Sequence, residues 1–126
     1  MVAYNFKAQF ADAIRSGKKT HTIRRNGKRR HAAAGERLQL YTGMRTRACR
    51  KILDVDPVCD GAHEIRIVVQ PDKIACISVG GHLIKHLNVF AITDGFESIE
   101  EMHAFFLDMH GVGMFVGTLI EWRGAR

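Results

Sequence analysis

Short apolar runs joined by tight turns are the feature that most constrains the fold of this chain. Residues 65–69 (IRIVV) place apolar side chains on alternate positions, which is typical of a half-buried strand. Pro71-Asp72 then turns the chain. A second apolar run follows at 74–79 and ends at Gly80-Gly81. The spacing predicts two adjacent strands, and elements this short favour a fold built mainly from sheet.

Other strands are predicted along the chain from β-branched and apolar residues. The expected segments lie at about 20–24, from 38 to 41, in a longer and bent stretch at 45–55 that Pro57 closes, and at 114–122. Asn26-Gly27 marks a turn after the first of these. Residues 82–89 fit a helix and a strand equally well.

Two segments have helical periodicity. Phe6, Phe10, Ala13 and Ile14 form one apolar stripe, and Gly17 follows where a left-handed C-cap would end a short helix. Near the C-terminus, residues 98–101 (SIEE) have the spacing of a capping box before an apolar run at helical intervals. We therefore expect a late helix that ends near residue 111.

These elements predict one domain spanning residues 1–126, of α+β class but mainly β. The expected architecture is a small barrel of five to seven strands with two or three flanking helices. The 46% hydrophobic content is enough for a single core. We find no signal peptide and no apolar run long enough to span a membrane, so a cytoplasmic protein is the default expectation.

The sequence implies no metal and no cofactor. Three cysteines without CxxC spacing predict reduced thiols rather than a disulfide framework or zinc site. His82 and His86 have metal-ligand spacing if they share a helix, but no third ligand is evident. Neither a phosphate-binding P-loop nor a GxGxxG pattern is present.

Positive charge is concentrated in the first half of the chain. Residues 1–51 contain fourteen Lys or Arg against two acids, a balance of +12, whereas residues 52–126 contain five against eleven, a balance of −6. Such asymmetry predicts a basic face for a polyanion, most simply RNA or a nucleotide. General solubility is the alternative explanation.

Residues 16–30 (SGKKTHTIRRNGKRR) hold seven basic residues and no acid. A strand that presents Lys19, Thr22 and Arg24 at its end predicts a site for an anionic or polar ligand. Arg24 could instead bridge strands, and Tyr41 could stack on a base or pack in the core. Residues 28–35 predict a mobile basic loop. The candidate ligand-binding residues are Arg24, Arg25, Lys28, Arg29, Arg30, Tyr41, Arg45 and Arg47, the last two sharing one face of the 45–55 strand.

The segment Gly17–Arg24 resembles the G-x-K-T-x-T-x-R signature of ASCH domains, which belong to the PUA-like superfamily. Gly35-Glu36-Arg37-Leu38 resembles the family's next strand entry, and residues 98–106 and 115–121 resemble its late helix and closing strand. The resemblance implies a PUA-like β-barrel that binds RNA or a modified nucleoside.

Some small bacterial members are similar to N4-acetylcytidine amidohydrolases. Carried over by position, this resemblance implies Lys19, Thr22 and Asp94 as catalytic residues. The acid is typically glutamate in that family, so Asp94 is one methylene shorter, and Glu97 is a nearby substitute with a poorer match in spacing.

The three residue types suit amide hydrolysis. A threonine hydroxyl needs a neighbouring base to become a nucleophile, and a lysine can be that base if burial or nearby positive charge lowers its pKa. A carboxylate could orient the lysine or carry the proton to the leaving amine. Because side chains alternate along a strand, Lys19 and Thr22 can converge only if the strand begins after Lys19 or carries a bulge there.

Two other functions fit the same residues. One is a non-catalytic RNA-binding regulatory module, which needs only the basic face. The other is a metal-independent ribonuclease, in which Lys19 would act with Tyr41 or a histidine.

Overall fold

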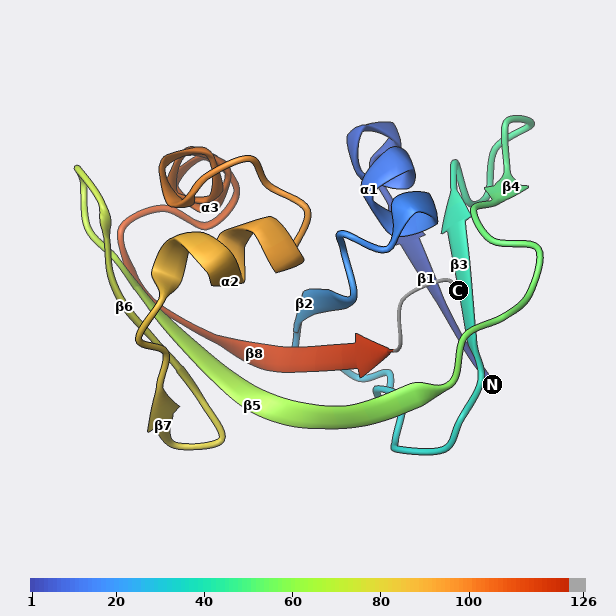
Figure 1. Cartoon of the computed structure of the whole chain (residues 1–126), viewed down its shortest axis with the longest axis horizontal. Coiled ribbons are helices and arrows are strands. Elements are labelled where there is room, and N and C mark those ends of the chain that lie inside the picture. The colour runs from blue at the N-terminus through green and yellow to red at the C-terminus, as the bar shows by residue number, and fades with distance from the viewer. Residues whose placement is uncertain (123–126) are drawn as a thin grey trace.

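Within the described residues, two β-sheets and three α-helices form the fold (Figure 1). The computed structural model describes residues 1–122. The first sheet has the order β1-β3-β4, with β1 parallel to β3. The second has the order β2-β8-β5-β6-β7 and is antiparallel throughout. The strands are β1 (Val2–Phe6), β2 (His21–Arg25), β3 (Leu38–Thr42), β4 (Arg50–Lys51), β5 (Cys59–Val69), β6 (Ile74–Val79), β7 (His82–Leu83) and β8 (Gly113–Trp122).

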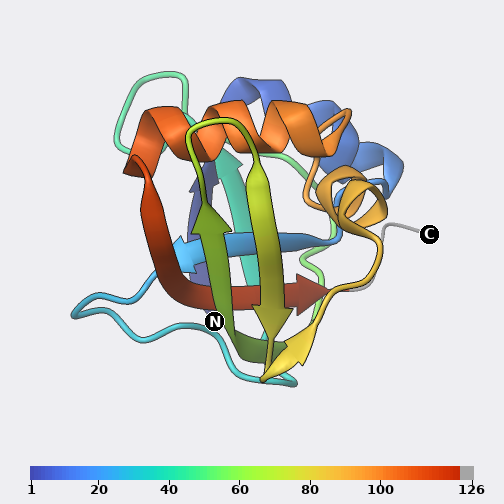
Figure 2. The ribbon, with the colours of Figure 1, turned by 90° about the vertical axis from the view of Figure 1, so that its left-hand side faces the viewer.

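The helices are short and lie at the end of the sheets. They are a 3-10 turn (Ala8–Phe10) that continues into α1 (Ala11–Ser16), then α2 (Leu87–Thr93) and α3 (Ile99–His110). The Ser98 hydroxyl accepts a hydrogen bond from the Glu101 amide at 3.1 Å, so the predicted cap is present at the start of α3. In Figure 2 α3 crosses the ends of β5 and β6, and it contacts both strands.

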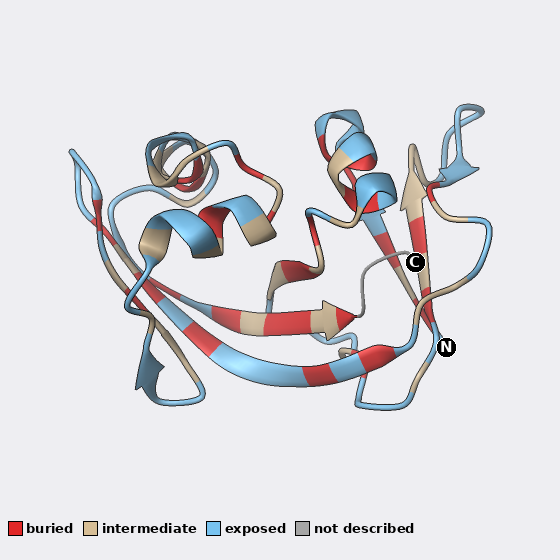
Figure 3. Cartoon of the chain, viewed as in Figure 1, coloured by how far each residue is buried: buried red, intermediate tan, exposed pale blue. Residues whose placement is uncertain are grey.

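The hydrophobic core is formed by the inner faces of both sheets and by the helices. Buried positions recur along β5 (Figure 3), where Ile65, Ile67 and Val69 face inward as their spacing predicts. Met102 and Phe106 of α3 are buried in the same core. Packing of this apolar face stabilises α3, because a helix of twelve residues is marginal alone.

The expectation of an α+β fold dominated by sheet is confirmed. The strand number was expected to be five to seven, whereas residues 1–122 contain eight, two of which have only two residues. Within this described part of the chain, the strand ladders form two sheets and no closed barrel. A backbone bridge between Arg37 and Val58 joins the sheets at one corner.

Side chains, rather than a strand ladder, connect β1 to the β2 side of the fold. The Arg24 guanidinium donates to the carbonyl of Asn5 at 2.7 Å, and the Arg29 guanidinium donates to the carbonyl of Ala3 at 2.8 Å. These bonds satisfy two carbonyls of β1, which a neighbouring strand would otherwise pair. Arg24 therefore bridges β2 and β1, one of the two roles that the sequence leaves open for it. It also contacts Thr22 on its own strand.

Two predicted elements are wrong. Phe6 belongs to β1 rather than to the first helix, because Val2, Tyr4 and Phe6 are buried at a spacing of two. The long strand at 45–55 does not form, and only β4 does. Arg45 has a positive φ of 65°, so it and Arg47 lie in an exposed turn and do not share a strand face.

Candidate functional site

The backbone before β2 directs Lys19 into the protein. Helix α1 ends at Gly17, whose φ of 83° is left-handed, as the sequence predicts. The Lys19 amide then donates to the carbonyl of Ala13 at 2.9 Å, and the Thr20 amide donates to the carbonyl of Thr93 at 3.1 Å. Strand β2 begins at His21, after Lys19. This late start satisfies the condition for Lys19 and Thr22 to converge.

The Lys19 amine is buried and makes contacts on several sides. Only 3% of the residue is exposed. Its Nζ donates to the backbone carbonyl of Asp94 and to Asp94 Oδ1, the latter at 3.2 Å. The rings of Phe10 and Phe6 lie 5.0 and 5.6 Å from Nζ, a distance at which a cation is attracted to an aromatic face.

Asp94 meets Lys19 because α2 ends there. Asp94 is the C-terminal cap of α2 and is 4% exposed. Its Oδ1 also lies 3.3 Å from Nε2 of His21, although that contact lacks the alignment of a hydrogen bond. The His21 ring packs on Phe90 of α2 with a centroid distance of 4.7 Å. His21 therefore contacts the Asp94 carboxylate from the face of β2 that is opposite to Thr22.

Burial and charge oppose each other in the Lys19–Asp94 pair. Burial lowers the pKa of the Lys19 amine, Asp94 opposes this shift, and the Arg24 guanidinium adds to it, so the pKa lies below its ordinary value. For Asp94, burial alone would raise the pKa, but Lys19 and then His21 outweigh it and leave the pKa lowered. The carboxylate is therefore ionised at neutral pH, while the lysine loses its proton more readily than an exposed lysine.

Thr22 and Arg24 lie on one face of β2. The Arg24 Nε donates to Thr22 Oγ1 at 3.0 Å, and Thr22 is 3% exposed. Since the threonine oxygen accepts this bond, its own proton remains available to a base. The guanidinium carbon of Arg24 lies 4.7 Å from the centre of the Phe6 ring, which holds the side chain in place.

A pocket of about 330 Å³ brings these groups together. Its lining includes Lys19, Thr22 and Asp94, the three residues that the resemblance singles out, with Arg24 and Arg25. Apolar walls come from Phe6 on β1, Phe105 and Phe106 on α3, and Phe115 on β8. A volume of this size is at the lower end for small-molecule sites.

His110 is a pocket residue that the sequence does not reveal. Its Nδ1 accepts hydrogen bonds from Arg25, with Nε at 3.1 Å and Nη2 at 2.6 Å. Arginine has donors only, so Nδ1 holds a lone pair and the ring proton is on Nε2. Burial, and secondly the charge of Arg25, lowers the pKa of His110. The ring is therefore a neutral donor at the pocket.

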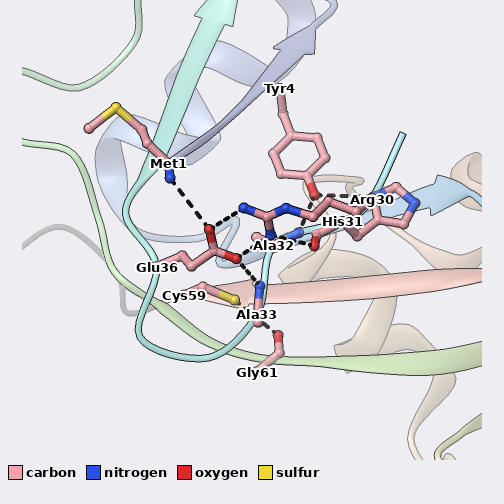
Figure 4. Close-up of polar contacts among 9 residues, drawn as sticks. All are labelled: Met1, Tyr4, Arg30, His31, Ala32, Ala33, Glu36, Cys59 and Gly61. Atoms are coloured by element: carbon pink, nitrogen blue, oxygen red, sulfur yellow. Dashed lines mark hydrogen bonds and ion pairs between the residues drawn. The ribbon is translucent and has the colours of Figure 1, made fainter. Parts of the chain in front are cut away.

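The segment between β2 and β3, predicted to be mobile, is held by a network around Glu36 and Tyr4 (Figure 4). Glu36 accepts two hydrogen bonds from Arg30, at 2.5 and 2.7 Å, and one from the Ala33 amide at 2.8 Å. The Arg30 hydrogen bond and then the Ala33 amide lower the pKa of Glu36 to about 2. Ala32, beside them, is buried. The loop that the sequence predicts to be mobile is therefore held by hydrogen bonds in the structure.

A second anchor runs through aromatic side chains. The Tyr4 hydroxyl accepts from the Ala32 amide at 3.1 Å and lies 3.1 Å from His31 Nδ1. His31 Nε2 lies 2.9 Å from the carbonyl of Arg25, which can only accept, so Nε2 donates. In neutral His31 the Nδ1 atom accordingly accepts the Tyr4 proton.

Three of the predicted ligand-binding residues lie apart from this pocket. Tyr41 is half-buried on β3, and Arg45 and Arg47 lie in the turn before β4. None of them is among the pocket residues. Lys28, Arg29 and Arg30 lie on the β2–β3 loop, beside the pocket rather than in it.

The described residues contain neither a cluster suited to a metal ion nor a helix suited to spanning a membrane. No group of three or more His, Cys, Asp or Glu in residues 1–122 is arranged to hold a metal ion. His82 lies in β7 and His86 just before α2, so they do not share a helix. Across those residues no helix has the length and apolar character needed to span a bilayer.

Gly95 allows Lys19 and Asp94 to approach each other. Its φ is 98°, and a Cβ there would lie 2.8 Å from Lys19 Cδ and 3.0 Å from Phe10 Cδ1. We expect Gly95→Ala to lower the free energy of unfolding by about 1–3 kcal/mol through backbone strain, and further through the contact with Lys19. Urea unfolding would measure it. Gly111→Ala is the control, because φ is 79° there and nothing lies within 4 Å. Equal losses in the two variants would show that the Lys19 contact is unimportant.

Comparison with known proteins gives no assignment: no family model, no curated protein and no solved structure matches this chain.

Proposed function

We propose that this protein is an amidohydrolase of the ASCH type, with a PUA-like arrangement of strands, which removes the acetyl group from N4-acetylcytidine. The observation that carries the proposal is the shared pocket of Lys19, Thr22 and Asp94. Asp94 is far from Lys19 and Thr22 in the sequence and all three are nearly fully buried, yet they meet at one concave surface. Burial and a specific charge partner shift the pKa values of Lys19 and Asp94, and ionisable groups of this kind in a cleft are candidates for a functional site.

Each group has a role in the proposed reaction. Thr22 Oγ1 attacks the acetyl carbonyl carbon while its proton passes to the neutral amine of Lys19. The C–N bond to the exocyclic nitrogen of cytosine then breaks, and that nitrogen takes a proton from Lys19 to leave as cytidine. Water hydrolyses the threonine ester and releases acetate. The carboxylate of Asp94 keeps Lys19 in position through both proton transfers.

Arg24 is the available donor for the negative charge that develops on the acetyl oxygen. Its Nε and Nη2 bind Thr22 and Asn5, whereas Nη1 has no hydrogen bond within residues 1–122 and is not shut off from solvent. A donor held in place before the reaction needs no rearrangement during it.

The test is hydrolysis of N4-acetylcytidine by the purified protein. We expect cytidine to be released, and Thr22→Val to abolish its release because valine keeps the shape but has no hydroxyl. Thr20→Val is the matched control, since Thr20 lies outside the pocket lining. Absence of cytidine release by the native protein would refute the proposal, and activity in Thr22→Val would refute the role of the threonine.

The contact between Lys19 and Asp94 favours a non-catalytic RNA- or nucleoside-binding module instead. Lys19 Nζ donates to two oxygens of Asp94, which stabilises the charged lysine that cannot act as a base. A protein that binds cytidine in this pocket without cleaving the acetylated form would fit this second function.

A further inference from the structure

A second pocket, of about 280 Å³, adjoins the first and is strongly basic. Five of its eight lining residues are Lys or Arg, and none is acidic: Arg24, Arg25, Lys28, Arg29 and Arg30, with Tyr4, Gly27 and His31. Arg24 and Arg25 line both pockets. A ligand could therefore occupy the two pockets at once with these arginines beside it.

Most of this positive charge is not neutralised within the protein. Among the five cations, residues 1–122 show an ion pair only for Arg30, with Glu36. Arg29 is bound to a backbone carbonyl of β1, and Arg25 to the neutral ring of His110. Lys28 has no hydrogen-bond or ion-pair partner in that part of the chain. Clustered cations repel one another, so an anion in this pocket would remove an unfavourable interaction.

The pocket is formed before any ligand arrives. The Glu36 and Tyr4 networks shown in Figure 4 fix the loop that carries Arg29, Arg30 and His31. A ligand therefore does not have to order the loop when it binds. Ordering the loop would cost free energy and weaken the affinity. The remaining N–H groups of the arginines suit phosphate, since a guanidinium can donate two parallel hydrogen bonds to two phosphate oxygens.

We infer that the basic pocket binds a phosphate group of a nucleotide whose base occupies the first pocket. The inference rests on the proposed function for the identity of the base, and it adds that the substrate is phosphorylated rather than a free nucleoside. The phosphate could be the monoester of a mononucleotide or a diester of an RNA chain, because the same guanidinium groups recognise both.

Binding of products separates this inference from the hydrolysis reaction. We would measure by calorimetry the affinities of cytidine, cytidine 5′- and 3′-monophosphate, and the dinucleotide CpC. At least one phosphorylated compound should bind about tenfold more tightly than cytidine or better, which is what one charge-assisted hydrogen bond supplies. Preference for a monophosphate would identify a mononucleotide as the substrate, and preference for CpC would identify RNA.

Paired variants locate the effect. In Lys28→Ala/Arg29→Ala the phosphorylated compounds should bind no better than cytidine. The control Arg66→Ala/Lys73→Ala removes the same charge from exposed positions on β5 and in the β5–β6 turn, and should keep the preference. Thermal unfolding would check that both variants fold. Equal affinities of native protein for cytidine and all phosphorylated compounds, or equal losses in the two variants, would overturn the inference. Failure to hydrolyse N4-acetylcytidine would leave these affinities unaffected.

Discussion

Replacing Lys19 by arginine is expected to abolish hydrolysis of N4-acetylcytidine while the protein stays folded. Arginine keeps the positive charge beside Asp94 but cannot lose its proton at any accessible pH. A general base contributes about 10²–10⁴ in rate, so kcat should fall by at least that factor. The measurement is cytidine release under saturating substrate, with circular dichroism and thermal unfolding to confirm the fold.

Lys18 provides a matched control for this prediction. It adjoins Lys19 in the sequence but is exposed and lines no part of the first pocket. Lys18→Arg should retain native activity. The rate of the native enzyme should also rise with pH through a value below the ordinary lysine pKa, because burial lowers the pKa of Lys19. Activity in Lys19→Arg, or a rate independent of pH, would show that Lys19 is not the base.

Asp94→Asn is expected to be the most destabilising change in the site. It removes the carboxylate and leaves the charge of Lys19 buried without a counter-ion. Loss of one partner of a buried pair typically costs about 3–5 kcal/mol. Urea unfolding at neutral pH would measure the change. Asp108→Asn removes an exposed carboxylate from α3 and should cost little.

The acid dependence of stability gives an independent check on Asp94. Its folded pKa is lowered, so its contribution is present above the unfolded pKa of about 3.9. That contribution is lost as the pH falls through the lower folded value. Asp94→Asn should lack this part of the acid destabilisation.

A double-mutant cycle tests the pair itself. The double variant Lys19→Met/Asp94→Asn should lose less free energy of unfolding than the sum of the losses in the two single variants. Additive losses would mean that the pair does not interact.

Local signals in the sequence predicted several elements because the chemistry that forms them is local. Gly17 ends α1, and Ser98 caps α3, where each residue type predicts it. The alternation at 65–69 matches the buried face of β5. The basic run alone predicts a ligand site at Lys19, Thr22 and Arg24, and side-chain alternation gives the condition that β2 begin after Lys19 or carry a bulge. Asp94 and the catalytic roles come only from the resemblance to a family.

The wrong predictions have physical causes of two kinds. Phe6 fits both a period of four with Phe10 and a period of two with Tyr4, and pairing of β1 with β3 decides for the strand. At 45–55 a tight turn forms instead of a strand, since Gly43 has a φ of 63° and a Cβ there would meet the Ala48 carbonyl oxygen at 2.8 Å. Neither strand pairing nor a tight turn of this kind can be read from the side-chain pattern of one segment.

Long-range contacts account for the site residues that were missed. His21 alternates with Thr22 along β2, but only the packing of α2 brings it to Asp94. His110 reaches the pocket because α3 ends beside Arg25, a residue distant in sequence. The anchoring role of Glu36 likewise depends on how the loop folds back onto β1.

The central proposition is that one positively charged pocket both receives the cytosine base and holds the reacting groups. Titration of the native protein with cytidine, followed by NMR of the labelled side chains, tests it most directly. We expect the largest shifts at the Thr22 methyl, the Lys19 amine and the Phe6 and Phe115 rings, with no change at Tyr41 or Arg45. Shifts confined to Tyr41 and the turn before β4, or none at saturating cytidine, would contradict it.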